Sequence, residues 1–263
     1  MLELFLLTML LGVVAGILAG LFGLGGGVII VPALLWLFSA QKFPDEYIMI
    51  MAIATSLATI IFTSLASIIA HHKHENIKWD RVYRLIPGVF IGAAVGAVLA
   101  DWVDAEILKD FFIVYLFYVG IRMALQLKPG AKKVKIKSYL DYPVGHGIGL
   151  LSAILGIGGG TLTVPYLLGQ QVAMKNAVAI SSVCGMPIAL SGVLVYILLS
   201  WDKVLLPEWS FGYIYLPALL GVVLCSVITA PIGAKLANKL PAQKIKRYFS
   251  GIIIFIAIKM MLG

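Results

Sequence analysis

Long uncharged stretches dominate the pattern of polar and apolar positions along this chain. Five of them exceed the roughly 20 residues that an α-helix needs to cross the hydrocarbon core of a bilayer. They cover residues 4–41, 47–70, 142–174, 176–201 and 209–234. Most of the charged residues lie in the shorter segments between them. The pattern therefore predicts a helical protein that crosses a membrane many times.

Two of these stretches contain the same glycine motif. FGLGGGVIIVP at 22–32 returns as LGIGGGTLTVP at 155–165, 133 positions later, with six of eleven residues identical. Glycine clusters interrupt helices, and non-helical backbone is tolerated at membrane depth only where protein or a water-filled cavity surrounds it. Interruptions at matching places in two halves are typical of a transporter whose substrate site lies between the halves.

The internal repeat extends beyond the glycine motif. AIATSLA at 52–58 matches AVAISSV at 177–183, and weaker matches continue to the end of each half. This similarity divides the chain into a first transmembrane repeat at 1–127, a basic linker at 128–141 and a second transmembrane repeat at 142–263.

The loop charges predict how the two repeats are oriented. Lys and Arg are in excess at 71–84, 122–141 and 235–247, whereas Asp and Glu are in excess at 101–110 and 200–208. Because positively charged loops stay in the cytoplasm, the first three segments are predicted to be cytoplasmic and the last two to face the other side. Equivalent loops of the two repeats thus lie on opposite sides, which predicts an inverted-topology repeat.

An inverted repeat requires an odd number of membrane crossings in each half. Three helices follow each glycine motif, predicted at 47–70, 85–100 and 111–127 and at 177–199, 211–234 and 246–262. The leading stretch of each half must then begin and end on the same side, as a broken or re-entrant hairpin with the glycines at its tip. The expected fold is an all-α polytopic membrane protein with about eight to ten membrane segments and both termini outside.

The composition excludes other classes of protein. Hydrophobic residues make up 61% of the chain and charged residues 12%, whereas a soluble domain carries about 25% charged residues. The net charge of +8 is spread over loops instead of forming one basic face, so it indicates membrane orientation and not nucleic-acid binding. Cys184 and Cys225 both lie in apolar stretches, which does not fit a disulfide framework.

The doubled pattern G-x-GGG-x-x-x-VP, the motif A-x-A-x-S one helix later and the two-half layout resemble the TauE/SafE family of sulfite and organosulfonate exporters. The resemblance covers essentially the whole chain. It implies a multi-pass protein of the bacterial inner or plasma membrane that moves small sulfur-containing anions such as sulfite, thiosulfate, sulfoacetate or taurine by alternating access. It implies a transporter and not an enzyme.

The residues of the repeated glycine motif are of the kind that can bind an anion. A glycine loop lets backbone N–H groups converge on a ligand, and the helix that follows offers its positive N-terminal end. The predicted substrate-binding glycines are Gly25, Gly26, Gly27, Gly158, Gly159 and Gly160. Thr161 and Thr163 replace Val28 and Ile30 of the first copy, so the second copy is predicted to form the polar half of the site.

Hydroxyls at the start of the next helix complete the predicted site. Thr55, Ser56, Ser181 and Ser182 occupy matching places in the two repeats, and hydroxyls can donate to the three oxygens of a sulfonate. Gln170 and Gln171 are expected at the mouth of the second hairpin. The sequence specifies no catalytic residue, cofactor, metal site or oligomeric state.

Two alternatives concern the motif residues. Glycines in membrane helices also serve only to let helices approach closely, and hydroxyls also bond to their own helix. Two further alternatives concern function: a membrane protein without a solute path that handles lipid or assists assembly, or an intramembrane hydrolase that uses Ser191.

Overall fold

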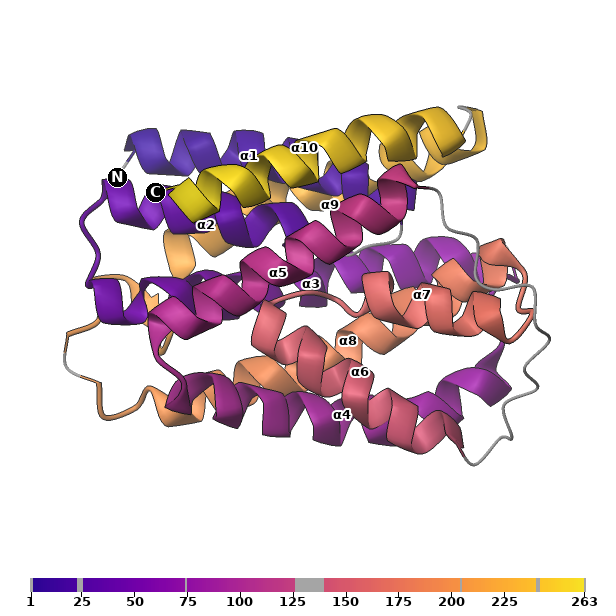
Figure 1. Ribbon diagram of the computed structural model, residues 1–263, viewed down its shortest axis with the longest axis horizontal. Coiled ribbons are helices and arrows are strands. Elements are labelled where there is room, and N and C mark those ends of the chain that lie inside the picture. Colours follow the sequence, from indigo (N-terminus) through magenta and orange to yellow (C-terminus); the bar gives the residue numbers. More distant parts are fainter. Residues whose placement is uncertain are drawn as a thin grey trace.

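The computed structural model describes residues 2–22, 26–73, 75–125, 140–203, 205–239 and 242–262, and this part of the chain is almost entirely helical (Figure 1). Its elements are α1 (Leu2–Phe22), α2 (Gly27–Ala40), α3 (Asp45–Lys73), α4 (Trp79–Trp102), α5 (Ala105–Ala124), α6 (Asp141–Leu155), α7 (Gly160–Gly169), α8 (Met174–Leu199), β1 (Ser210–Phe211), β2 (Ile214–Tyr215), α9 (Leu216–Lys239) and α10 (Ala242–Leu262). The predicted all-α fold is confirmed.

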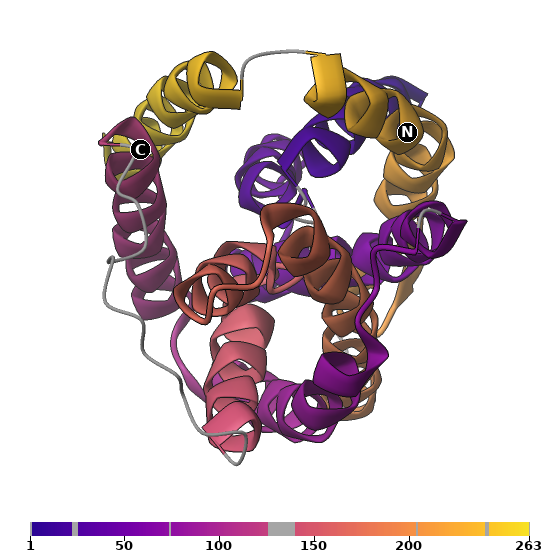
Figure 2. The same ribbon diagram turned by 90° about the vertical axis from the view of Figure 1, so that its right-hand side faces the viewer.

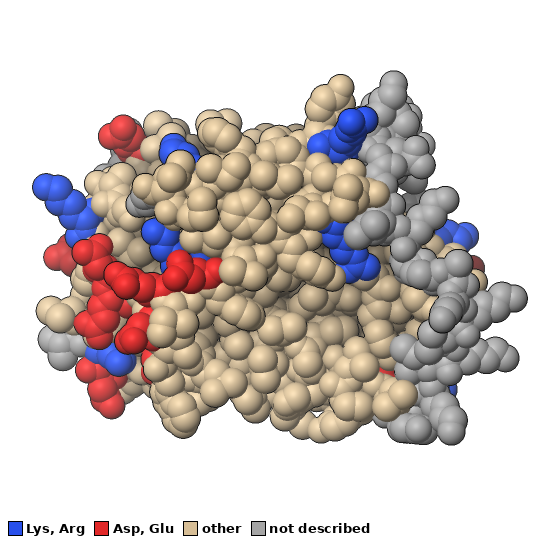
Figure 3. All heavy atoms as spheres, viewed as in Figure 1, with Lys and Arg blue, Asp and Glu red and all other residues tan. Residues whose placement is uncertain are grey.

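The outer surface of the molecule is apolar, as a lipid-facing surface must be. Leu10, Leu198 and Ile228 are 63%, 71% and 70% exposed. Helices α1, α3, α4, α8 and α9 are long and apolar enough to cross a membrane. In Figure 3, Asp and Glu gather at one end of the molecule, and a broad central band carries neither acidic nor basic side chains. The protein is therefore a multi-pass membrane protein.

Each half begins with a pair of helices of which at least one is too short to cross a bilayer. Helix α2 has 14 residues, and α6 and α7 have 15 and 10, against the roughly 20 that a crossing needs. Both pairs are hairpins that turn at the glycine motif. In Figure 1 the first hairpin opens toward the end where both termini lie, and the second opens toward the other end.

Helix α3 lies at the centre of the bundle and packs against α8, its counterpart in the second half. Around this pair, α1 packs against α9, α4 against α6 and α5 against α10. If each helix of α1–α5 is replaced by its counterpart in α6–α10, and the reverse, the same helix pairs result: α1–α9 becomes α6–α4. Figure 2 looks along the long axis, so most of these helices are seen end-on. The arrangement supports the inverted repeat and its boundaries, which stay predictions; the linker at 128–139 lies outside the described residues.

Glycines on α4 let α6 approach closely. Gly88, Gly92 and Gly96 lie one turn apart, and each faces a backbone carbonyl of α6, those of Tyr142, His146 and Leu150. A methyl group at any of these glycines would overlap the carbonyl oxygen. Small residues of this kind allow membrane helices to pack with their backbones in contact. Close packing therefore explains these glycines outside the repeated motif.

The predicted helix at 211–234 begins too early. Residues 210–215 form the antiparallel hairpin β1–β2, in which Ser210 pairs with Tyr215, and α9 begins only at Leu216. Trp209 and Gly212 have φ angles of 67° and 61°, which a helix cannot contain. The apolar character of this segment reflects burial, since Tyr213 and Ile214 are only 1% and 3% exposed.

Substitution of Gly92 by Ala tests the close contact between α4 and α6. We expect Gly92→Ala to lower the free energy of unfolding by about 1–3 kcal/mol, because the added methyl group overpacks the interface. Gly147→Ala on α6 is the matched control, since nothing lies within 4 Å of its added methyl group. Thermal unfolding in detergent measures both variants, and equal unfolding temperatures would contradict this packing.

Candidate functional site

The second glycine motif forms a tight connection between α6 and α7. Helix α6 ends in a Schellman motif, in which the N–H groups of Gly156 and Ile157 donate to the carbonyls of Ala153 and Ser152 at 3.3 and 2.9 Å. Gly156 has a φ angle of 65°, a conformation that favours glycine. The sequence therefore stops α6 inside the molecule and pairs two of the carbonyls in its last turn.

Helix α7 begins at Gly160, after four residues that lie between the two helices. Gly159 is its N-cap residue with a φ angle of 72°, and its carbonyl accepts the N–H groups of Leu162 and Thr163 at 3.0 and 2.7 Å. The N–H groups of Gly160 and Thr161 have no hydrogen-bond partner in the part of the chain that the structure describes. Such free N–H groups at a helix N-terminus suit an anion.

The first glycine motif repeats this cap. Gly26 is the N-cap residue of α2 with a φ angle of 78°, and its carbonyl accepts the N–H groups of Ile29 and Ile30 at 3.0 and 3.1 Å. Gly25, which was predicted to bind substrate, lies outside the described residues. The two motifs thus start their second helices in the same way.

The tips of the two hairpins touch. Gly27 lies against the backbone of Gly156 and Ile157, so a Cβ atom at Gly27 would lie 2.9 Å from the Cα atom of Ile157. Helix α3 joins this contact, because the Ser56 hydroxyl donates to the Gly156 carbonyl at 2.8 Å. The structure therefore brings Gly27 together with the second motif and Ser56.

Other predicted hydroxyls have partners in the protein. Thr55 accepts the N–H group of Tyr215 at 3.0 Å, Ser182 accepts the Ser67 hydroxyl at 2.9 Å, and Thr161 forms a hydrogen bond with the Tyr115 hydroxyl. Each bond joins elements that are far apart in sequence. These contacts give the three residues a role in holding the helices together.

Two predicted residues and one new residue have buried hydroxyls without a partner. Thr163 and Ser181 are 0% and 1% exposed, and neither side-chain oxygen has a hydrogen-bond partner among the described residues. The same is true of Ser152, which is 0% exposed. Ser152 was not among the predicted site residues, although LSAILGIGGG places a serine one turn before the glycine loop.

The site is closed in this conformation. Thr55 and Ser56 are both 0% exposed. A surface cleft with a cavity volume of about 120 Å³ lies elsewhere, at the acidic end of the molecule, lined among others by Glu46, Asp101 and Lys203. In the described ranges, no group of three or more His, Cys, Asp or Glu side chains could hold a metal ion.

The sequence of this chain matches one known protein family over nearly its whole length. Residues 8–260 match the sequence profile of the family described as "Sulfite exporter TauE/SafE". The chain belongs to this family.

Relatives of this TauE/SafE protein are described as probable membrane transporter proteins. One from Haemophilus influenzae is 38% identical over 258 residues, which cover 98% of each chain. One from Methanocaldococcus jannaschii is 28% identical over 261 residues, which cover 97% of this chain and 95% of its own. No solved structure matches the chain. The family and these relatives show that the protein is a membrane transporter of the cell membrane.

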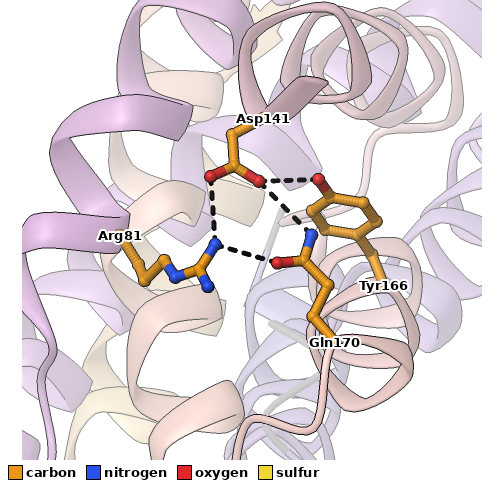
Figure 4. A network of polar contacts seen from close by, with 4 residues as sticks. All are labelled: Arg81, Asp141, Tyr166 and Gln170. Atoms are coloured by element: carbon orange, nitrogen blue, oxygen red, sulfur yellow. Dashed lines mark hydrogen bonds and ion pairs between the residues drawn. The ribbon is translucent and has the colours of Figure 1, made fainter. Parts of the chain in front are cut away.

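In this TauE/SafE protein a polar network joins the two arms of the second hairpin at its open end, where α6 begins and α7 ends (Figure 4). Asp141, at the start of α6, is only 1% exposed and accepts Arg81 of α4 at 3.2 Å and the Tyr166 hydroxyl at 2.7 Å. Gln170, predicted at this mouth, accepts Arg81 at 2.9 Å and donates to Asp141 at 3.3 Å. The network ties both arms of the hairpin to α4.

Removal of the Asp141 carboxylate tests the network. We expect Asp141→Ala to lower the free energy of unfolding by about 1–3 kcal/mol, because Tyr166 and Arg81 lose their buried acceptor. Asp202→Ala, at an exposed loop position, is the control and should change stability by less than about 0.5 kcal/mol. Thermal unfolding in detergent gives both values. Equal stability of the two variants would show that the network contributes nothing.

Proposed function

We propose that the protein carries small sulfur-containing anions, such as sulfite, thiosulfate, sulfoacetate or taurine, across the cell membrane. The anion binds where the two glycine hairpins meet. The two halves of the chain, related as inverted repeats, expose this place to the two sides of the membrane in turn. The family description supports the sulfur oxyanion, and the hairpin geometry supports the location.

The observation that carries the proposal is the set of hydrogen-bond donors at the second hairpin. The N–H groups of Gly160 and Thr161 lie at the N-terminus of α7, and the Thr163 hydroxyl lies buried in the first turn of that helix. None of these groups has a hydrogen-bond partner among the residues that the structure describes. A sulfonate or sulfite presents three oxygens that accept such donors. Neutral donors at a helix N-terminus bind an anion while allowing its release, which transport requires.

Contacts at the open end of each hairpin fit alternating access. The second hairpin is held to α4 by the network around Asp141. The first hairpin is held to α10 by Lys259, whose ammonium lies 4.5 Å from the ring centre of Trp36. The two hairpins open toward opposite ends of the molecule (Figure 1). Under the proposal, release of one contact while the other persists opens the site to one side only.

The structure gives the hydrolase alternative no support. Ser191, its candidate nucleophile, donates its hydroxyl to the carbonyl of Phe90 at 2.7 Å. The bond joins α8 to α4, which pack against each other. A serine in this setting fixes a helix contact.

Flux through proteoliposomes tests the proposed function. We expect the purified wild-type protein to move at least one of sulfite, thiosulfate, taurine and sulfoacetate. We expect Gly159→Leu to lower that flux about tenfold or more, because a side chain at this left-handed position, beside Ile188, Thr163 and Ser152, displaces the groups of the proposed site. Gly251→Leu on α10 is the matched control, since nothing lies within 4 Å of a Cβ atom there, and it should keep wild-type flux.

Ser181→Ala is a second variant for the same flux assay, in case Gly159→Leu does not fold. This change removes only the buried, unpartnered oxygen of Ser181 and is expected to lower flux without loss of expression. Absence of wild-type flux for the whole panel would refute the sulfur-anion permease, and normal flux in both variants would refute the location of the site.

A further inference from the structure

Ser152 and Thr163 each place a hydroxyl in the interior of the molecule. Both side chains are 0% exposed, and neither oxygen has a hydrogen-bond partner in the described part of the chain. A buried hydroxyl left unpaired costs about 1–3 kcal/mol. Native proteins rarely keep such groups without a reason, and a bound ligand is one.

The two hydroxyls converge on one place from different helices. Ser152 lies in the last turn of α6 and Thr163 in the first turn of α7. A Cβ atom built on Gly159 would lie 3.5 Å from the Ser152 oxygen and 3.4 Å from the Thr163 oxygen. The Ile188 side chain borders the same space, with Cδ1 2.8 Å from that Cβ position. A Cβ atom at residue 159 would overlap Ile188, so in this closed conformation the Ile188 side chain lies beside the two hydroxyls.

The first hairpin provides an internal comparison. By the repeat alignment, Ser152 and Thr163 correspond to Ala19 and Ile30. The Ile30 side chain lies 3.2 Å from the Cβ position of Gly26, and the nearest other neighbour is Ala15. The atoms nearest to the same place in the first hairpin thus include no side-chain hydroxyl. The caps are alike in the two hairpins, so the cap geometry does not require hydroxyls in the second one.

We propose that Ser152 is a substrate-binding residue, which with Thr163 donates hydrogen bonds to the oxygens of a sulfite or sulfonate group bound beside Gly159. This inference rests on the proposed function. The two hydroxyls lie beside Gly159, and the N–H groups of Gly160 and Thr161, which have no partner among the described residues, follow it in the first turn of α7. A sulfonate or sulfite group has three oxygens for them, and the apolar Ile188 borders the remaining side.

The test compares anion affinity with stability in the same variants. Ser152→Ala and Thr163→Val are each expected to raise the KM for the transported anion about tenfold or more in proteoliposomes, because a hydrogen bond to a charged group is lost. Each is also expected to reduce the anion-induced rise in unfolding temperature. Without the anion, Ser152→Ala should unfold at the wild-type temperature or above, since an unpaired buried hydroxyl has been removed.

Ser200→Ala is the matched control. Its hydroxyl is 2% exposed and donates to the Tyr196 carbonyl at 2.7 Å, so its loss should lower the unfolding temperature and leave KM unchanged. If Ser152→Ala behaves like this control, Ser152 is structural and the inference is overturned. If the wild type carries no anion of the panel, the proposed function fails first, and the two failures are thereby distinguished.

Discussion

Backbone that leaves the helical conformation inside a membrane must be surrounded by protein, and the whole structure depends on this constraint. Each glycine hairpin turns at a place where several peptide groups lack helical partners. Each hairpin tip packs against the other, because Gly27 of the first lies against Gly156 and Ile157 of the second. The central helix α3 adds the Ser56 hydroxyl to the Gly156 carbonyl. Neither tip would be stable in lipid without the other half.

Much of the fold could be predicted from the sequence because membrane helices and their breaks have strong local signals. Uncharged stretches predicted the helices, and the doubled glycine motif predicted both hairpins. The boundary between β2 and α9 could not be predicted, because the segment at 211–215 is as apolar as a helix and only its structure shows the positive φ angle of Gly212. The choice between crossing helix and turn there depends on how Tyr213 and Ile214 are buried.

The partners of the candidate site residues could not be predicted, because they come from distant parts of the chain. Thr55 bonds to Tyr215 and Ser56 to Gly156, and no local pattern links residues 160 and 100 positions apart. Thr55, Ser56 and Ser181 looked alike in sequence, yet the first two have partners and Ser181 has none among the described residues. Ser152 was missed because its counterpart, Ala19, carries no hydroxyl, so the repeat gave no reason to single it out.

The central claim is that the two hairpins enter the membrane from opposite faces and meet inside it. Single cysteines at the exposed positions Gln41, between α2 and α3, and Ala173, between α7 and α8, test this claim in a chain with Cys184 and Cys225 replaced by alanine. The account predicts that a membrane-impermeant maleimide added to intact cells labels Gln41→Cys, and labels Ala173→Cys only after the membrane is permeabilised. Labelling of both positions from the same face would contradict it.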